Sequence, residues 1–147
     1  MRAEFLVPPM SKQNFPEPTV GIFIFNPQGE LLLVRSHKWP DAFVVPGGHV
    51  ELGERLEEAA MREAEEETGL EIHGLEFIGF QQFIYDPAFW KQRHFIFFDF
   101  AAKTDSSEVR LNDEAQEYIW VVPAEALELN LDSYTRTSLE AYLGKGR

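Results

Sequence analysis

The stretch "GGHVELGERLEEAAMREAEEETGL", residues 47–70, decides the fold and poses the question of function. Eight glutamates fall between Glu51 and Glu67, and only Arg55 and Arg62 offset them. The opening glycines lack a Cβ, so their backbone can approach a ligand closely. Residues 55–68 are rich in Glu, Ala and Arg, which favour helix. The stretch therefore predicts a glycine-rich loop that leads into an acidic helix.

The expected helix over residues 55–68 carries glutamates on the face that should be apolar. At about 100° per residue, Leu56, Ala59 and Ala60 form a narrow stripe that faces the core. The glutamates on the same arc, one turn later, are Glu63, Glu66 and Glu67. Carboxylates directed at a core are costly unless a partner neutralises them. A solvated acidic face would not need this geometry, whereas a site for Mg²⁺, with Mn²⁺ as a substitute, explains it.

Neighbouring residues extend this candidate metal site. Backbone carbonyls of the glycine loop, with Gly48 as the candidate, would add oxygen ligands. Arg62 lies one turn from both Glu58 and Glu66 and could orient either carboxylate. Glu54, at the helix start, is either an acidic residue that favours the helix dipole or a part of the site.

Composition excludes several classes of function. The chain has 147 residues, no cysteine and a net charge of −12. One domain is expected, and disulfide scaffolds, thiol nucleophiles and cysteine-based zinc sites are excluded. The negative field repels a nucleic acid polymer, whereas a small phosphorylated ligand can approach if cations intervene. We expect no membrane partner and a cytoplasmic location, because no apolar run approaches about 18 residues.

Strand and helix patterns alternate along the chain, which predicts an α/β fold with a mixed sheet and helices on its faces. An extended N-terminal arm is expected over 1–17, followed by a single domain over 18–147. Expected strands cover 19–26, 30–36, 42–45, 75–85, 93–103 and 117–122. Besides 55–68, helices are expected over 123–129 and 132–144. The proline-rich arm and the apolar strand over 93–103 are compatible with a homodimer.

The stretch over residues 48–70 resembles the box of the Nudix hydrolase family, and the chain is most similar to MutT-like bacterial nucleoside-triphosphatase members. The matching positions are Gly48, Glu54, Arg62, Glu63, Glu66, Glu67, Gly69 and Leu70. Ala64 departs from the usual larger aliphatic residue, which concerns packing rather than chemistry. The resemblance implies an α/β/α sandwich around a mixed sheet. It also implies metal ligation by the three box glutamates and Mg²⁺-dependent hydrolysis of a nucleoside diphosphate linked to another group.

The implied mechanism is attack of a water on phosphorus, with a carboxylate as general base. Glu66 and Glu114 are the candidates for this base, and Glu117 competes with Glu114. Arg62 belongs to the catalytic set because it orients a box carboxylate. A non-catalytic binding module is disfavoured, since such domains usually lose box carboxylates and this chain keeps them.

The substrate is a small nucleotide, and the C-terminal resemblance favours a (deoxy)nucleoside triphosphate cleaved to the monophosphate and pyrophosphate. ADP-ribose or a nucleotide sugar is the alternative, and a dinucleoside polyphosphate is less favoured. Arg35 is the candidate phosphate contact, with Glu54 also on the substrate side. Phe89 and Trp90 are candidates for base stacking, because two large rings in a polar loop need a reason.

Overall fold

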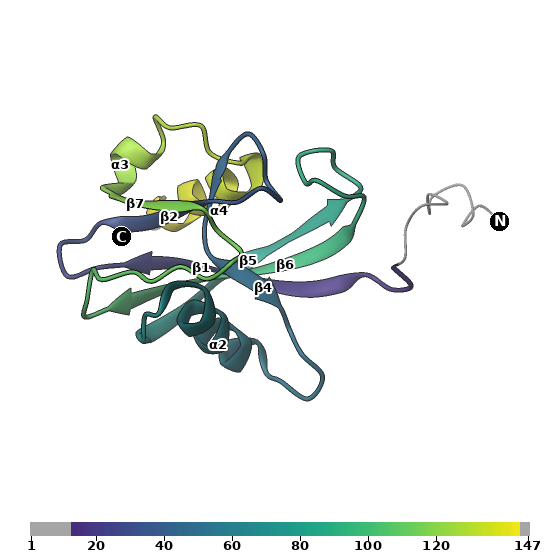
Figure 1. Cartoon of the computed structure of the whole chain (residues 1–147), viewed down its shortest axis with the longest axis horizontal. Helices are drawn as coiled ribbons and strands as arrows, with labels where there is room; N and C mark the ends of the chain where they lie inside the picture. Colours follow the sequence, from purple (N-terminus) through teal and green to yellow (C-terminus); the bar gives the residue numbers. More distant parts are fainter. Residues whose placement is uncertain (1–12, 145–147) are drawn as a thin grey trace.

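The computed structural model describes residues 13–144, which form one mixed seven-stranded sheet with helices on both faces (Figure 1). The strands are β1 (Glu17–Phe25), β2 (Leu31–Arg35), β3 (Phe43–Val44), β4 (Gly47–His49), β5 (Ile72–Ile84), β6 (His94–Thr104) and β7 (Glu117–Val121). The helices are α2 (Leu56–Thr68), α3 (Pro123–Ala126) and α4 (Ser133–Leu143). This architecture confirms the predicted α/β fold. The expected arm over 1–17 lies mainly outside the described residues, and β1 already begins at Glu17.

Two apolar layers hold the helices to the sheet. Side chains alternate along β1, so Ile22 and Ile24 face α2 while Phe23 faces α3 and α4. On the α2 side, the small side chains of Ala59, Ala60 and Ala64 are fully buried. The alanine at position 64 thus lets the helix lie close to the strands, and this layer fixes which face of α2 points inward.

The sheet forks along β1, and this fork creates the space beside α2. β6 pairs with β1 in parallel along its whole length. On the other edge, the first half of β1 pairs with β4 and its last residue pairs with β2. The sequence predicted a loop where β4 lies, because Gly-Gly-His has weak strand propensity. The strand forms because Gly47 packs directly against β1, where a Cβ would collide with the carbonyl oxygen of Val20.

Local signals set most of the remaining boundaries. Gly69 ends α2 with a φ of 74°, a conformation that glycine adopts without strain. Asp132 caps α4 by accepting hydrogen bonds from the backbone of Tyr134 and Thr135. The pairing of β5 with β6 shifts in register between Phe77 and Gly79. The helix expected over 123–129 is shorter, since α3 covers only Pro123–Ala126. Between residues 13 and 144, no helix is long and apolar enough to cross a membrane.

Leu139→Ala should destabilise the fold without touching the acidic helix. Leu139 is fully buried between α4 and the sheet. Its truncation should lower the free energy of unfolding by about 2–5 kcal/mol in urea denaturation. Glu140→Ala, at an exposed position of the same helix, is the matched control and should change it by less than about 0.5 kcal/mol. Equal effects of the two variants would contradict the packing of α4 on the sheet.

Candidate active site

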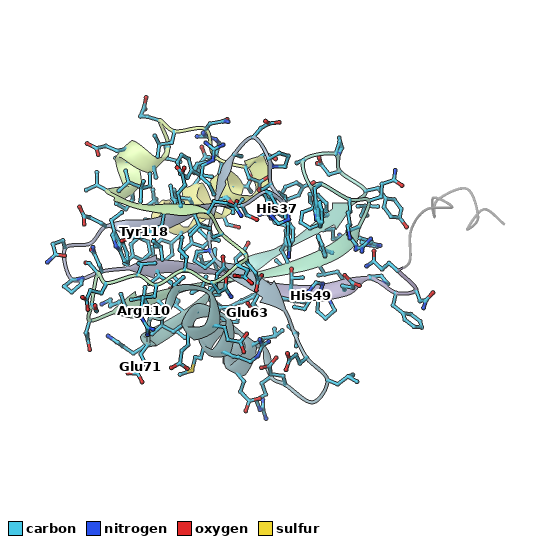
Figure 2. The ribbon with its side chains drawn as sticks, viewed as in Figure 1. His37, His49, Glu63, Glu71, Arg110 and Tyr118 are labelled. Carbon is cyan, nitrogen blue, oxygen red and sulfur yellow. The ribbon has the colours of Figure 1, made fainter. Side chains whose placement is uncertain are left out.

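Three carboxylates converge at the C-terminal end of α2. Glu63 and Glu67 come from its inner face, and Glu114 comes from the loop between β6 and β7. One carboxylate oxygen of each lies within 4.8 Å of the others. Glu63 and Glu67 are only 7% and 4% exposed, and Figure 2 shows Glu63 where α2 meets the strands. The helix places them there because the buried alanines fix the inward face of α2.

Backbone groups bring the glycine loop and the Glu114 loop to this carboxylate cluster. The Gly47 amide donates to Oε1 of Glu67 at 3.0 Å. A Cβ at Gly48 would collide with the Glu63 carboxylate, so only glycine allows the close approach. From the other side, the amides of Arg110 and Asn112 donate to the last carbonyls of α2. This docking of its loop, with the bond from the Glu114 amide to Oδ1 of Asn112 at 2.9 Å, holds Glu114 against the cluster.

Arg62 connects the cluster to the loop before the helix. Its guanidinium donates to both carboxylate oxygens of Glu54, at 2.7 and 3.0 Å. It also donates to Glu63 at 3.0 Å and to Glu66 at 3.1 Å. The Arg62 hydrogen bond lowers the pKa of Glu54 to about 2. Glu66 and Glu58 were the two partners predicted for Arg62, and Arg62 pairs with Glu66. Glu58 instead accepts a hydrogen bond from the Arg55 amide in the first turn of the helix.

The cluster holds more negative charge than the protein neutralises. Burial raises the pKa of Glu67 to about 8, and the charges of Glu114 and Glu63 add to this effect. The hydrogen bond from the Gly47 amide lowers the pKa and only partly offsets the increase. Burial also raises the pKa of Glu63. No donor among residues 13–144 reaches the buried Oε1 of Glu63. An all-oxygen donor set with an unpartnered buried oxygen fits a hard divalent cation.

The structure divides the predicted metal ligands into two groups. Glu63, Glu67 and Gly48 lie together, and Glu114, predicted as a base, joins them. The Glu66 side chain is 54% exposed, and it pairs with Arg62 and lies outside the cluster. The helix geometry alone placed Glu66 too far inward, because α2 buries a narrower face than the predicted arc. The metal and base roles of Glu66 stay predictions.

A pocket of about 150 Å³ begins at the cluster and continues into an aromatic region. Its lining includes Gly48, Glu67, Glu114, Lys38, Trp39, Phe89, Phe95, Phe97, Asp99, Asp132 and Tyr134. Of the predicted substrate contacts, only Phe89 lies in this lining. Trp90 packs outside it, with its ring 4.9 Å from that of His37. Arg35 lies over the Phe43 ring, and Glu54 is engaged by Arg62.

Sequence reasoning missed Lys38 and Asp99. Lys38 belongs to the loop between β2 and β3, and it reaches the pocket through tertiary packing. Asp99 carried a visible signal, because it is the only charged residue in the apolar run 95–102.

Known proteins support these observations. The NUDIX domain family model matches residues 15–142. Nucleoside triphosphatase NudI of Escherichia coli K12 is 31% identical over 107 residues, covering 69% of this chain and 76% of that protein. The crystal structure of a MutT protein from Methanosarcina mazei Go1 superimposes with a TM-score of 0.76 at 26% identity, covering 93% of this chain and 99% of that one. The NUDIX domain of Shewanella oneidensis NrtR, solved with ADP ribose, shares the fold with a TM-score of 0.74 at 18% identity over 100% of this chain and 99% of that one.

The buried Glu67 predicts a distinct pH dependence of stability in the absence of divalent cations. Its pKa of about 8 in the folded state exceeds the usual 4.5, so folding favours the protonated form. The stabilising contribution is complete below pH 4.5 and is lost as the pH rises through 8. In thermal melts with EDTA, the Tm of the parent should therefore fall relative to that of Glu67→Gln between these pH values. A Tm difference that does not change with pH would contradict the burial of this carboxylate.

Proposed function

The chain belongs to the NUDIX domain family of hydrolases acting on phosphoanhydride bonds, and we propose that its substrate is a (deoxy)nucleoside triphosphate. On this proposal the enzyme requires Mg²⁺, for which Mn²⁺ can substitute, and releases a nucleoside monophosphate and pyrophosphate. The observation that carries it is the cluster of the buried Glu63 and Glu67 with the half-buried Glu114 at one end of an aromatic pocket. The choice of a triphosphate is supported by the similarity to a nucleoside triphosphatase.

The three clustered carboxylates, with the Gly48 carbonyl, would hold the cation, which would polarise phosphoryl oxygens and lower the pKa of a water. Arg62 keeps Glu63 and Glu66 in fixed orientations through its two hydrogen bonds. A carboxylate takes the proton from the attacking water. Glu66, exposed beside the cluster, and Glu114, inside it, are the two candidates for that step.

Lys38 and Phe89 are the proposed substrate contacts within the pocket. Lys38 is the only Lys or Arg among the described lining residues, so it is the available cation for a phosphate. Phe89 offers a ring face to the base. Trp90 helps to position Lys38 and does not contact the substrate itself. Its amide donates to the Lys38 carbonyl at 2.9 Å, which joins the two loops. Arg35 and Glu54 would reach a substrate only if they left their present partners.

ADP-ribose or a nucleotide sugar is the second candidate substrate, because the same carboxylate cluster could act on any diphosphate linkage. A domain of the same fold has been solved with ADP ribose. A dinucleoside polyphosphate is less favoured. A homodimer and a cytoplasmic location stay predictions.

A phosphate-release panel with Mg²⁺ tests the proposal. Triphosphates should yield phosphate only when inorganic pyrophosphatase is added, since the first product is pyrophosphate. Phosphate released without pyrophosphatase would mean that the terminal phosphate is cleaved, which contradicts the proposed reaction. Added phosphatase reports the hydrolysis of ADP-ribose and nucleotide sugars. If only these substrates are turned over, the substrate assignment would change, whereas the assignment of the site would stand.

Glu67→Gln should lower kcat with Mg²⁺ by at least about 100-fold, because it removes one negative ligand from the cluster. Glu65→Gln makes the same charge change on the same helix at an exposed position and should retain the parent kcat. Similar kcat values for the two variants would argue against the cluster as the catalytic centre.

Glu66→Gln should lower kcat by about 100-fold or more with little change in Tm, because this side chain is largely exposed. Glu114→Gln is the paired variant, and the pH profile of kcat separates them. The variant that loses the acidic limb of the profile identifies the general base. Parent-like kcat in Glu66→Gln would remove Glu66 from the reaction.

A further inference from the structure

The buried carboxyl group of Asp99 lines the pocket but takes no part in the proposed hydrolysis. Asp99 lies in the middle of β6, where its neighbours across the sheet are Gly21 on β1 and Gly79 on β5. It is only 7% exposed. A buried acid in an apolar strand costs stability, and an aliphatic residue would pack there without that cost. A role toward a ligand would explain why an acid stands at this position.

Asp99 is held in one orientation. Its Oδ2 accepts a hydrogen bond from the Ser138 hydroxyl at 2.6 Å. Gln81 donates to that hydroxyl at 2.9 Å and to the Tyr134 carbonyl at 2.8 Å, which ties β5 and α4 together around the carboxyl. Oδ1 lies over Gly21, where a Cβ would come within 2.6 Å of it. The missing side chain at Gly21 therefore leaves room for Oδ1.

A second carboxyl group faces the same pocket. Asp132 is 5% exposed and also belongs to the lining. Its Oδ2 accepts the amides of Tyr134 and Thr135 that cap α4, at 3.0 and 3.1 Å. The two acids are close enough for the charge of Asp132, after burial, to raise the pKa of Asp99, which reaches about 6. Asp99 is thus mainly ionised, and acts as an acceptor, at neutral pH and above.

The lining selects the chemistry of the ring that it accepts. Phe97, Tyr134 and Phe89 supply aromatic surface. A space of about 150 Å³ holds one small ring system rather than a whole nucleotide. Ionised carboxylates accept hydrogen bonds and donate none, so they favour a base edge rich in N–H groups. An exocyclic amine offers two such groups. Uracil and thymine offer a single ring N–H on this edge, between two carbonyl oxygens that a carboxylate would repel, and hypoxanthine lacks the 2-amine of guanine.

We propose that Asp99 is a specificity-determining residue that accepts a hydrogen bond from the exocyclic amine of the substrate's base. The enzyme then favours nucleotides of cytosine, adenine or guanine over those of uracil, thymine or hypoxanthine. The predicted preference in turnover rests on the proposed function. The predicted preference in binding rests only on the pocket.

Two matched substrate pairs test the inference. The bases of dCTP and dUTP differ at the 4-amine and its adjacent ring nitrogen, and dGTP and dITP differ only in the 2-amine. The parent should show at least about tenfold higher kcat/KM for the amine-bearing member of a turned-over pair. Asp99→Asn should bring this ratio close to 1, mainly through KM. Asp105→Asn, at a side chain 93% exposed, is the control with the same charge change and should keep the parent ratio.

Binding of the monophosphates separates this inference from the reaction. Fluorescence of Trp39, which lines the pocket, reports binding of dCMP against dUMP and of dGMP against dIMP without hydrolysis. The same preference, with no triphosphate turnover, would support Asp99 and overturn the proposed reaction. Three results would overturn the role of Asp99. They are turnover without a preference for the amine-bearing base, a preference that is unchanged in Asp99→Asn, and no binding of the monophosphates. If Asp99→Asn does not fold, Ser138→Ala removes the Oδ2 partner and should lower the ratio, whereas an unchanged ratio would contradict the inference.

Discussion

The burial of two carboxylates at the end of α2 is the constraint on which the structure depends. Glu63 and Glu67 cannot turn to solvent, because the alanines beside them anchor the same helix face in the core. Charge in that position requires a counter-charge that the described residues only partly supply. Three features shape the space around these two groups: the glycines of β4, the hydrogen bonds of Arg62 and the docking of the Glu114 loop. A divalent cation would complete this arrangement in the proposed enzyme.

The fork of the sheet converts this constraint into a site. Because β1 changes its partner from β4 to β2, a pocket opens beside the glycines and reaches β6. Acidic residues line both parts of the pocket in different environments. The cluster around Glu67 combines several carboxylates and suits a cation. Asp99 is instead fixed by a neutral hydroxyl, so it suits a hydrogen-bond donor.

The sequence predicted the parts that depend on local pattern. Helical periodicity located α2 and the inward position of Glu63 and Glu67. Parts that depend on tertiary pairing were beyond such reasoning. β4 is a strand only because β1 lies beside it, and Glu66 is exposed because packing buries a narrower face of α2 than periodicity predicts. Lys38 and Asp99 reach one pocket through the fork of the sheet, which no local pattern encodes.

Anomalous diffraction from crystals grown with Mn²⁺ tests the central claim most directly. The account predicts a manganese peak among Glu63, Glu67 and Glu114, coordinated directly by their carboxylate oxygens. That result would show that the buried carboxylates exist to hold a cation. A well-ordered cluster without a peak at saturating Mn²⁺, or a peak bound only at other carboxylates, would contradict it.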